Sequence, residues 1–188
     1  MKKAIYLLIV LLGISAGSVH PQNISVGTGK NPMNGETWVT IEIRARQTYR
    51  SFTGTDELPM LGIQCSQSGK KRSFDIFVHT GILAESRYAA TLMGTARGQR
   101  TFHQKLDDEK PRGRTWTVEN DQRTYTYEGF GESGMNNYPP KRFLKDILSG
   151  KQLLIEFQPY EWNGDFTAEF NIQGLGDEFR KHEECQAK

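Results

Sequence analysis

The densest cluster of acidic side chains in this 188-residue chain is formed by Asp107, Asp108 and Glu109. Consecutive carboxylates offer the oxygen ligands that hard cations such as calcium take. A calcium-binding loop, however, alternates its ligands along the chain and bends at a glycine, and neither feature is present here. We therefore interpret the cluster as a solvated loop, and we predict no metal site and no cofactor.

The residues that usually serve in hydrolysis are scattered along the chain. The histidines lack the i, i+4 spacing of a zinc site, and the sequence contains no G-x-S-x-G nucleophile motif. No acid pair, set of metal ligands or catalytic triad is recognisable, so we predict no catalytic residues. We rank a hydrolase below two binding functions as a hypothesis. The four histidines are His20, His79, His103 and His182.

Cys65 and Cys185 are the only cysteines. An even number of cysteines in an exported chain favours a disulfide, and this one would close a loop of about 120 residues. Two alternatives remain, namely two unpaired buried thiols and a catalytic cysteine. Catalysis is the weakest of the three, because neither residue sits in a CxxC pair or beside an obvious base.

Aromatic side chains gather in the later half of the chain. On a β-sandwich, exposed aromatics such as Tyr160 and Trp162 can stack on sugars or anchor a protein partner, but they can equally be cross-strand pairs. The glycine-rich segment 129–137 is predicted to be a loop, with Phe130 and Tyr138 as possible walls of a ligand cleft. The remaining members of the group are Trp116, Tyr125 and Tyr127.

Period-two alternation of apolar residues predicts a mainly β domain, an antiparallel sandwich or twisted sheet of about seven to eight strands with two short helices. The strongest local signal is a hairpin of 153–157 and 166–172 around Asn163-Gly164, a pair suited to a tight turn. The other predicted strands lie around 37–47, 60–67, 72–80, 88–93, 102–106, 115–119 and 123–128.

Two segments show helical periodicity instead. Pro139 and Pro140 suit the first turn of a helix that Gly150 closes, and its apolar stripe is predicted to join the core. After the hairpin, Leu175, Phe179 and His182 recur at helical spacing on the segment that carries Cys185. A hairpin, a helix and a cysteine thus form a closing unit at the end of the chain.

The beginning of the chain has the layout of a secretory signal peptide. Lys2 and Lys3 precede an apolar run too short to span a membrane, and small residues up to Ser18 follow it. We predict a signal peptide over 1–18, a flexible arm over 19–35 and one β-rich domain over 36–188. The predicted location is exported, periplasmic or secreted, in a bacterium, with no membrane anchor after cleavage.

Removal of residues 1–18 would leave 22 basic and 22 acidic residues. A partner attracted by the electrostatic field of the whole protein, such as a nucleic acid, would need an excess of basic over acidic residues. We therefore predict no nucleic-acid partner. The local basic stretch at Lys70, Lys71 and Arg72 is interpreted as a solvated hairpin tip rather than a binding patch.

The order of several landmarks resembles a known family. LGIQC, KLDDEKPRGRTW, FLKDILSGKQLLIE, a PY element, an F-x-A-x-F-x-I-x-G-L strand and a terminal cysteine together look like the exported VasI/TagO proteins associated with type VI secretion. The similarity runs from about Trp38 to Cys185. It implies a recognition surface at Lys105, Asp107, Lys110 and Trp116, where mixed charge beside an aromatic suits a polar partner.

These observations lead to two function hypotheses. The first is a non-enzymatic periplasmic accessory or adaptor protein that resembles the type VI secretion-associated family and contacts another envelope protein. The alternative is a carbohydrate- or cell-wall-binding module that uses the late aromatics Tyr160 and Trp162.

Overall fold

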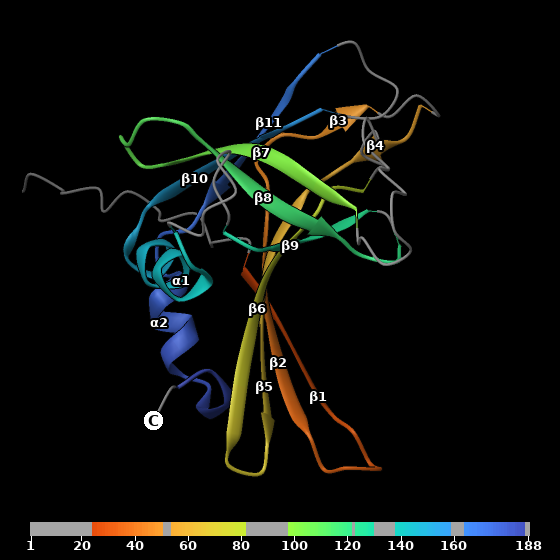
Figure 1. Cartoon of the computed structure of the whole chain (residues 1–188), viewed down its shortest axis with the longest axis vertical. Helices are drawn as coiled ribbons and strands as arrows, with labels where there is room; N and C mark the ends of the chain where they lie inside the picture. Colours follow the sequence, from red (N-terminus) through yellow and green to blue (C-terminus); the bar gives the residue numbers. More distant parts are fainter. Residues whose placement is uncertain are drawn as a thin grey trace, which may run out of the picture.

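A nine-stranded antiparallel sheet dominates the computed structural model of the chain, which describes residues 24–50, 54–81, 98–121, 123–129, 138–158 and 164–186 (Figure 1). The order of its strands is β1-β2-β5-β6-β9-β8-β7-β10-β11, and a separate small ribbon pairs β3 with β4. The mainly β fold predicted from alternation is confirmed. The strands are β1 (Ile24–Lys30), β2 (Thr37–Arg44), β3 (Tyr49–Arg50), β4 (Asp56–Glu57), β5 (Met60–Ser68), β6 (Lys71–His79), β7 (Gln99–Leu106), β8 (Arg112–Val118), β9 (Thr124–Tyr127), β10 (Gln152–Phe157) and β11 (Phe166–Asn171).

The sheet folds over on itself and encloses one core. The amide of Arg46, just after β2, donates to the carbonyl of Glu169 on β11, at 2.8 Å. The Tyr49 ring meets Phe166 edge-on at 4.8 Å between centroids. These contacts join the first half of the sheet to its last strand, and Figure 1 shows β7 to β11 crossing above the long β1-β2-β5-β6 leg. The result is roughly a sandwich.

Alternation decides which side chains fill that core. Val39, Ile41 and Ile43 on β2 are buried, and the same pattern recurs on β5 and β10. In antiparallel register, Ile41 lies opposite Ile63. Successive strands therefore add their apolar residues to one face of the sheet, as period two requires.

Two helices cover one side of the molecule. Helix α1 (Pro140–Ser149) has proline in its first turn and buries Phe143, Leu144 and Ile147, so its stripe belongs to the core as predicted. Helix α2 (Leu175–Arg180) starts after Gly174, whose φ of 84° suits glycine. A short 3₁₀ turn, η1 (Glu183–Cys185), follows it and carries the last cysteine.

A disulfide joins Cys65 on β5 to Cys185 on η1, with a Cα–Cα distance of 5.1 Å and 120 residues between them. The predicted bridge is confirmed. Cys65 is fully buried and Cys185 is half-buried, so the bridge ties the C-terminal segment to the face of the long leg.

One prediction about the N-terminal region is wrong where the structure can test it. Residues 24–30 fall in the segment expected to be a flexible arm, yet they form strand β1, which pairs with β2 along its whole length. Backbone hydrogen bonds hold this edge strand, and the Trp38 ring lies directly over Gly29, where any Cβ would clash. Because β1 buries little apolar surface, alternation gave no signal for it.

Several other predictions lie outside the described residues. They are the signal peptide over 1–18, the strand around 88–93, Phe130, and the turn at Asn163.

Glu169 on β11 ties the segment after β2 to the C-terminal hairpin. Its carboxylate accepts hydrogen bonds from Arg46 at 2.7 Å, Gln47 at 3.0 Å and Gln152 at 2.7 Å. Partial burial acts to raise the pKa of Glu169, but the hydrogen bonds from Gln152, Gln47 and Arg46 outweigh it and hold the pKa below its ordinary value of 4.5.

We expect this carboxylate to make stability depend on pH. A group whose pKa is lower in the folded than in the unfolded state stabilises the fold above its unfolded pKa, and this stabilisation is lost as the pH falls through the folded pKa. Glu169→Gln should therefore lower the free energy of unfolding by about 1 kcal/mol at neutral pH and by much less near pH 3. Urea denaturation at both pH values measures this, with Glu183→Gln, at an exposed position, as the control. A deficit of equal size at both pH values would contradict it.

Candidate functional site

Asp107, one of the predicted recognition residues, is part of the scaffold. Its Oδ1 accepts the backbone N–H groups of Lys151 and Gln152, both at 2.9 Å, and its own amide donates to the Gln152 carbonyl. Its φ of 45° is the left-handed conformation that Asp tolerates. Asp107 therefore fastens the end of β7 to the connection between α1 and β10.

Trp116 cannot belong to a recognition surface, because its side chain has an exposed fraction of 0 %. It lies on β8 among aromatic rings, with centroid distances of 5.1 Å to Tyr127, 5.8 Å to Phe102 and 6.3 Å to Phe143. The predicted surface role of Trp116 is wrong. Trp116 lies on the inward face of an alternating strand, and it is therefore buried in the core although a charged loop is close to it in sequence.

The other predicted binding residues are spread over the molecule. Lys105 on β7 lies opposite Leu154 of β10 and lines neither of the two basic hollows described below. Lys110 is exposed in the β7–β8 loop and lines one of those hollows. Tyr160 and Trp162 lie outside the described residues. Of the four residues in the predicted surface, only Lys110 faces a hollow.

The first basic hollow, called the arginine pocket here, lies between the β7–β8 hairpin and the start of α1. Its volume is about 60 Å³, and it contains four cationic side chains and one carboxylate. The guanidinium carbons of Arg114 and Arg142 lie 5.0 and 5.1 Å from the centroid of the Tyr138 ring. The lining residues are Gln104, Leu106, Glu109, Lys110, Arg112, Arg114, Tyr138 and Arg142.

Tyr138 lines the arginine pocket, and Tyr127 lies beside it. Burial raises the pKa of Tyr127, although the Arg114 guanidinium acts in the opposite sense, and the Tyr127 hydroxyl donates to the Tyr138 carbonyl at 2.9 Å. Burial, and then a hydrogen bond to Asp146 at 2.6 Å, raise the pKa of Tyr138. Both phenols are therefore neutral at physiological pH, and the cations define the charge of the pocket.

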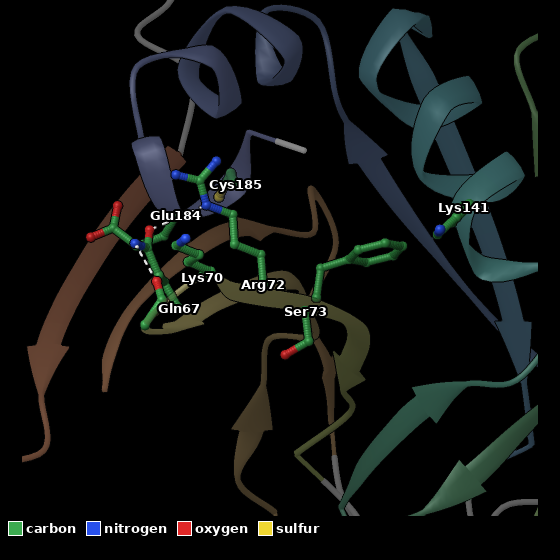
Figure 2. Close-up of a pocket in the computed structure, with 9 residues that line it drawn as sticks. Gln67, Lys70, Arg72, Ser73, Lys141, Glu184 and Cys185 are labelled. Carbon is green, nitrogen blue, oxygen red and sulfur yellow. Dashed lines mark hydrogen bonds between the residues drawn. The ribbon is translucent and has the colours of Figure 1, made fainter. Parts of the chain in front are cut away.

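The second basic hollow, called the disulfide groove here, has a volume of about 820 Å³ and runs beside Cys185 (Figure 2). Three segments that are distant in sequence line it: the end of the β5–β6 hairpin, the start of α1, and η1. Figure 2 shows Lys70 and Arg72 on the hairpin side near Glu184, and Lys141 across the groove on α1. The remaining lining residues are Gln67, Gly69, Ser73 and Phe74.

Arg72 links the hairpin to the C-terminal segment at one end of the groove. Its guanidinium donates to the Gln186 carbonyl, and its Nε donates to the Gln67 side chain at 3.2 Å. The side chains of Lys70 and Lys141, by contrast, make no ion pair or hydrogen bond with any other residue that the structure describes. The interpretation of this basic stretch as a mere hairpin tip omitted its position beside the disulfide.

Neither hollow presents recognisable chemical machinery. Among the described residues, no group of three or more His, Cys, Asp or Glu side chains could hold a metal ion, and both cysteines are in the disulfide. Cations outnumber carboxylates in both hollows, and amides and aromatic rings lie beside them. Such groups bind and orient anions and polar chains.

Sequence reasoning missed most of the residues that line the hollows. A signal existed for Arg114, since it shares its alternating face with Trp116 and should therefore point inward. Tyr138 was identified as a possible cleft wall and does line the arginine pocket. No local pattern brings Lys141 to Lys70, because only the tertiary fold places α1 beside the β5–β6 hairpin.

None of the helices that the structure describes is long and apolar enough to cross a membrane. Comparison of the chain with protein-family models, with curated proteins and with solved structures found no match.

Proposed function

We propose that this chain is a non-enzymatic exported accessory or adaptor protein that acts through protein–protein contacts, in the manner its resemblance to the type VI secretion-associated VasI/TagO proteins implies. The disulfide groove is the observation that carries the proposal. A disulfide is compatible with export, because such bonds persist in oxidising compartments.

The charge of the groove indicates what kind of partner it binds. Lys70, Arg72 and Lys141 face a single carboxylate, Glu184. The chain after residue 18 has equal numbers of basic and acidic residues, so this excess is local rather than a general property of the surface. A local positive groove favours an acidic segment of a partner, and it increases specificity and association rate more than raw affinity.

The backbone beside the groove suits an extended segment. Strand β6 pairs with β5 from Lys71 to His79, but with β9 only from Phe77 to His79. The first half of β6 therefore has one edge that no described strand occupies, and Ser73 and Phe74 of this half line the groove. A free edge can accept a further strand through main-chain hydrogen bonds. Pockets beside the edge bind every second side chain of the added strand and so give specificity.

These features together define the proposed contact. An extended acidic segment of another envelope protein would pair with the free edge of β6 and place carboxylates near Lys70 and Lys141. Cys185 lines the groove, so the disulfide holds the C-terminal wall in place.

Charge reversal in the groove should abolish this binding. We expect a fluorescent peptide of alternating Glu and Val to bind the wild-type chain, and Lys70→Glu with Lys141→Glu to weaken binding at least about tenfold, because two charge-assisted contacts become repulsive. Fluorescence anisotropy titration measures the affinity.

The matched control carries Lys71→Glu with Lys145→Glu, which makes the same change in net charge at exposed lysines outside the groove. This control should bind the peptide about as well as wild type. Equal weakening in both double variants would show a non-specific charge effect and contradict the proposed site.

A further inference from the structure

The long leg of the sheet is joined to the crossing strands by a short pairing. In the strand order β6 is followed by β9, and the two strands pair only from Phe77 to His79 of β6, whereas β5 pairs with β6 along its whole length (Figure 1). At the His79 end the register continues, because the Thr80 amide donates to the Arg123 carbonyl at 2.9 Å. Beyond Phe77 the structure describes no further pair of the two strands. We call this short pairing the β6–β9 joint.

The joint ends where two carboxylates come to face each other. Phe77 lies opposite Thr126, so continuing the same antiparallel register by two residues sets Asp75 opposite Glu128. Glu128 remains in line with the sheet on its other side, since its amide donates to the Thr115 carbonyl of β8 at 3.1 Å. Like charges directly opposite each other destabilise strand pairing. Repulsion between Asp75 and Glu128 therefore accounts for the early end of the joint.

A third carboxylate adds to this repulsion. Asp75, Glu119 and Glu128 line one hollow of about 430 Å³ on the outer face of the sheet, called the acidic hollow here. Partial burial, and then the charges of Glu119 and Glu128, raise the pKa of Asp75 above its ordinary value of 3.8. The remaining lining residues are Gln64, Phe77, Thr124 and Thr126.

Hydroxyl groups hold the other two carboxylates of the acidic hollow in place. The Thr126 hydroxyl donates to Glu119 at 2.8 Å, and the Thr117 hydroxyl donates to Glu128 at 3.0 Å. Both donors are neutral, so these hydrogen bonds orient the carboxylates without cancelling their charge. Asp75 therefore meets two carboxylates that are fixed in position.

The described groups on the other sides of Asp75 add no positive charge to the hollow. Gln64 lies opposite Asp75 on β5 and is neutral. On the same face of β6, the nearest ionisable groups are Lys71 and His79, and neither lines the acidic hollow. The imidazole of His79 lies 3.9 Å from the Asp121 carboxylate instead. Asp75 is therefore the group whose protonation changes the repulsion at the joint.

We propose that the acidic hollow is a pH-sensitive switch of the β6–β9 joint. At neutral pH the carboxylates of Asp75 and Glu128 keep the two strands apart beyond Phe77. When Asp75 takes up a proton at acidic pH, its hydroxyl donates to the Glu128 carboxylate and the ladder extends by two residues. The leg and the crossing strands are then joined more firmly. Residues 71–74 of β6 stay outside the extended ladder, so the switch does not depend on the proposed partner of the disulfide groove.

The alternation of an antiparallel ladder identifies the hydrogen bond that the switch adds. Thr80 donates to Arg123, and the hydrogen-bonded pairs of such a ladder recur at every second residue. In this series Ile76 and Tyr127 are the first pair beyond the joint. The Ile76 amide should therefore donate to the Tyr127 carbonyl in the extended ladder.

Amide hydrogen exchange of the ¹⁵N-labelled chain, followed by NMR, tests this directly. We expect the protection factor of the Ile76 amide in the wild type to be several-fold higher near pH 3 than near pH 7, because the added hydrogen bond must open before exchange. In Asp75→Asn the side chain cannot ionise, so the Ile76 amide should be equally protected at both pH values.

Melting temperatures give a second readout. An acid whose pKa is raised in the folded state destabilises the fold above that pKa, and this destabilisation disappears as the pH falls through it. Asp75→Asn should therefore raise the melting temperature by about 2 °C near pH 7 and by much less near pH 3. Water reaches the exposed Asp75 side chain and screens its charge, which keeps the effect small.

The matched control is Asp108→Asn, which makes the same change in net charge at an exposed position outside the acidic hollow. It should leave the melting temperature unchanged at both pH values. Glu128→Gln removes the facing charge and keeps an acceptor for Thr117, so it should stabilise the fold with the same pH dependence as Asp75→Asn.

Three results would each overturn the proposal. The first is an equal gain in melting temperature for Asp75→Asn at both pH values, which would show a pH-independent effect of the amide. The second is no gain near pH 7. The third is a protection factor of the wild-type Ile76 amide that does not change with pH, and this measurement needs no variant to fold.

Discussion

Removal of the Cys65–Cys185 bridge, by the double change to alanine, is expected to lower the free energy of unfolding by about 3 to 4 kcal/mol. The bond closes a loop across 120 residues, so its loss greatly enlarges the unfolded ensemble. Cys65 is fully buried on β5 and contributes further through packing. Urea denaturation of the double variant and the wild type measures the difference.

The wild-type chain in strong reductant serves as the control. It should unfold at nearly the same urea concentration as the double variant, because both lack the cross-link but only one lacks the sulfur atoms. A loss below about 1 kcal/mol would show that other contacts hold the C-terminal segment, in contradiction to this account. The double variant should also bind the acidic peptide more weakly, since Cys185 lines the groove.

Trp116→Ala is expected to lower the free energy of unfolding by about 3 to 5 kcal/mol, because it empties the centre of the aromatic core. The indole is fully buried against Phe102, Tyr127 and Phe143. Chemical denaturation followed by far-UV circular dichroism measures this loss without relying on tryptophan fluorescence.

Trp116→Phe separates core packing from a role for the indole nitrogen. The buried Nε1 has no hydrogen-bond partner among the described residues. Phenylalanine removes that polar atom and keeps most of the apolar volume. It should therefore lower the free energy of unfolding much less than alanine does. If alanine at this position left stability unchanged and only weakened partner binding, Trp116 would be a recognition residue after all.

The fold was largely predictable because apolar residues alternate clearly within individual strands. In β2 and β10, buried residues alternate with partly exposed ones, and such strands show a clear period of two. The prolines and the apolar stripe similarly indicated α1, and the even cysteine count indicated the bridge. Strand β1 was not predicted from the sequence, because an edge strand held by backbone hydrogen bonds needs no apolar pattern.

The candidate sites were much less predictable than the fold. A charged loop beside Trp116 suggested a surface, but alternation along β8 turns Trp116 inward, and the fold uses Asp107 to fasten a connection. The disulfide groove joins Lys70, Lys141 and Cys185, which only the tertiary fold brings together.

The most direct test of the proposed function is photo-crosslinking at the groove in the native host. A benzophenone amino acid at Ser73, which lines the groove, should give one defined adduct with an envelope protein, whereas the same probe at exposed Thr101 on β7 should not. The adduct should disappear in the Lys70→Glu, Lys141→Glu background and persist in the Lys71→Glu, Lys145→Glu background. No adduct at Ser73, or an adduct that survives reversal of Lys70 and Lys141, would contradict the account.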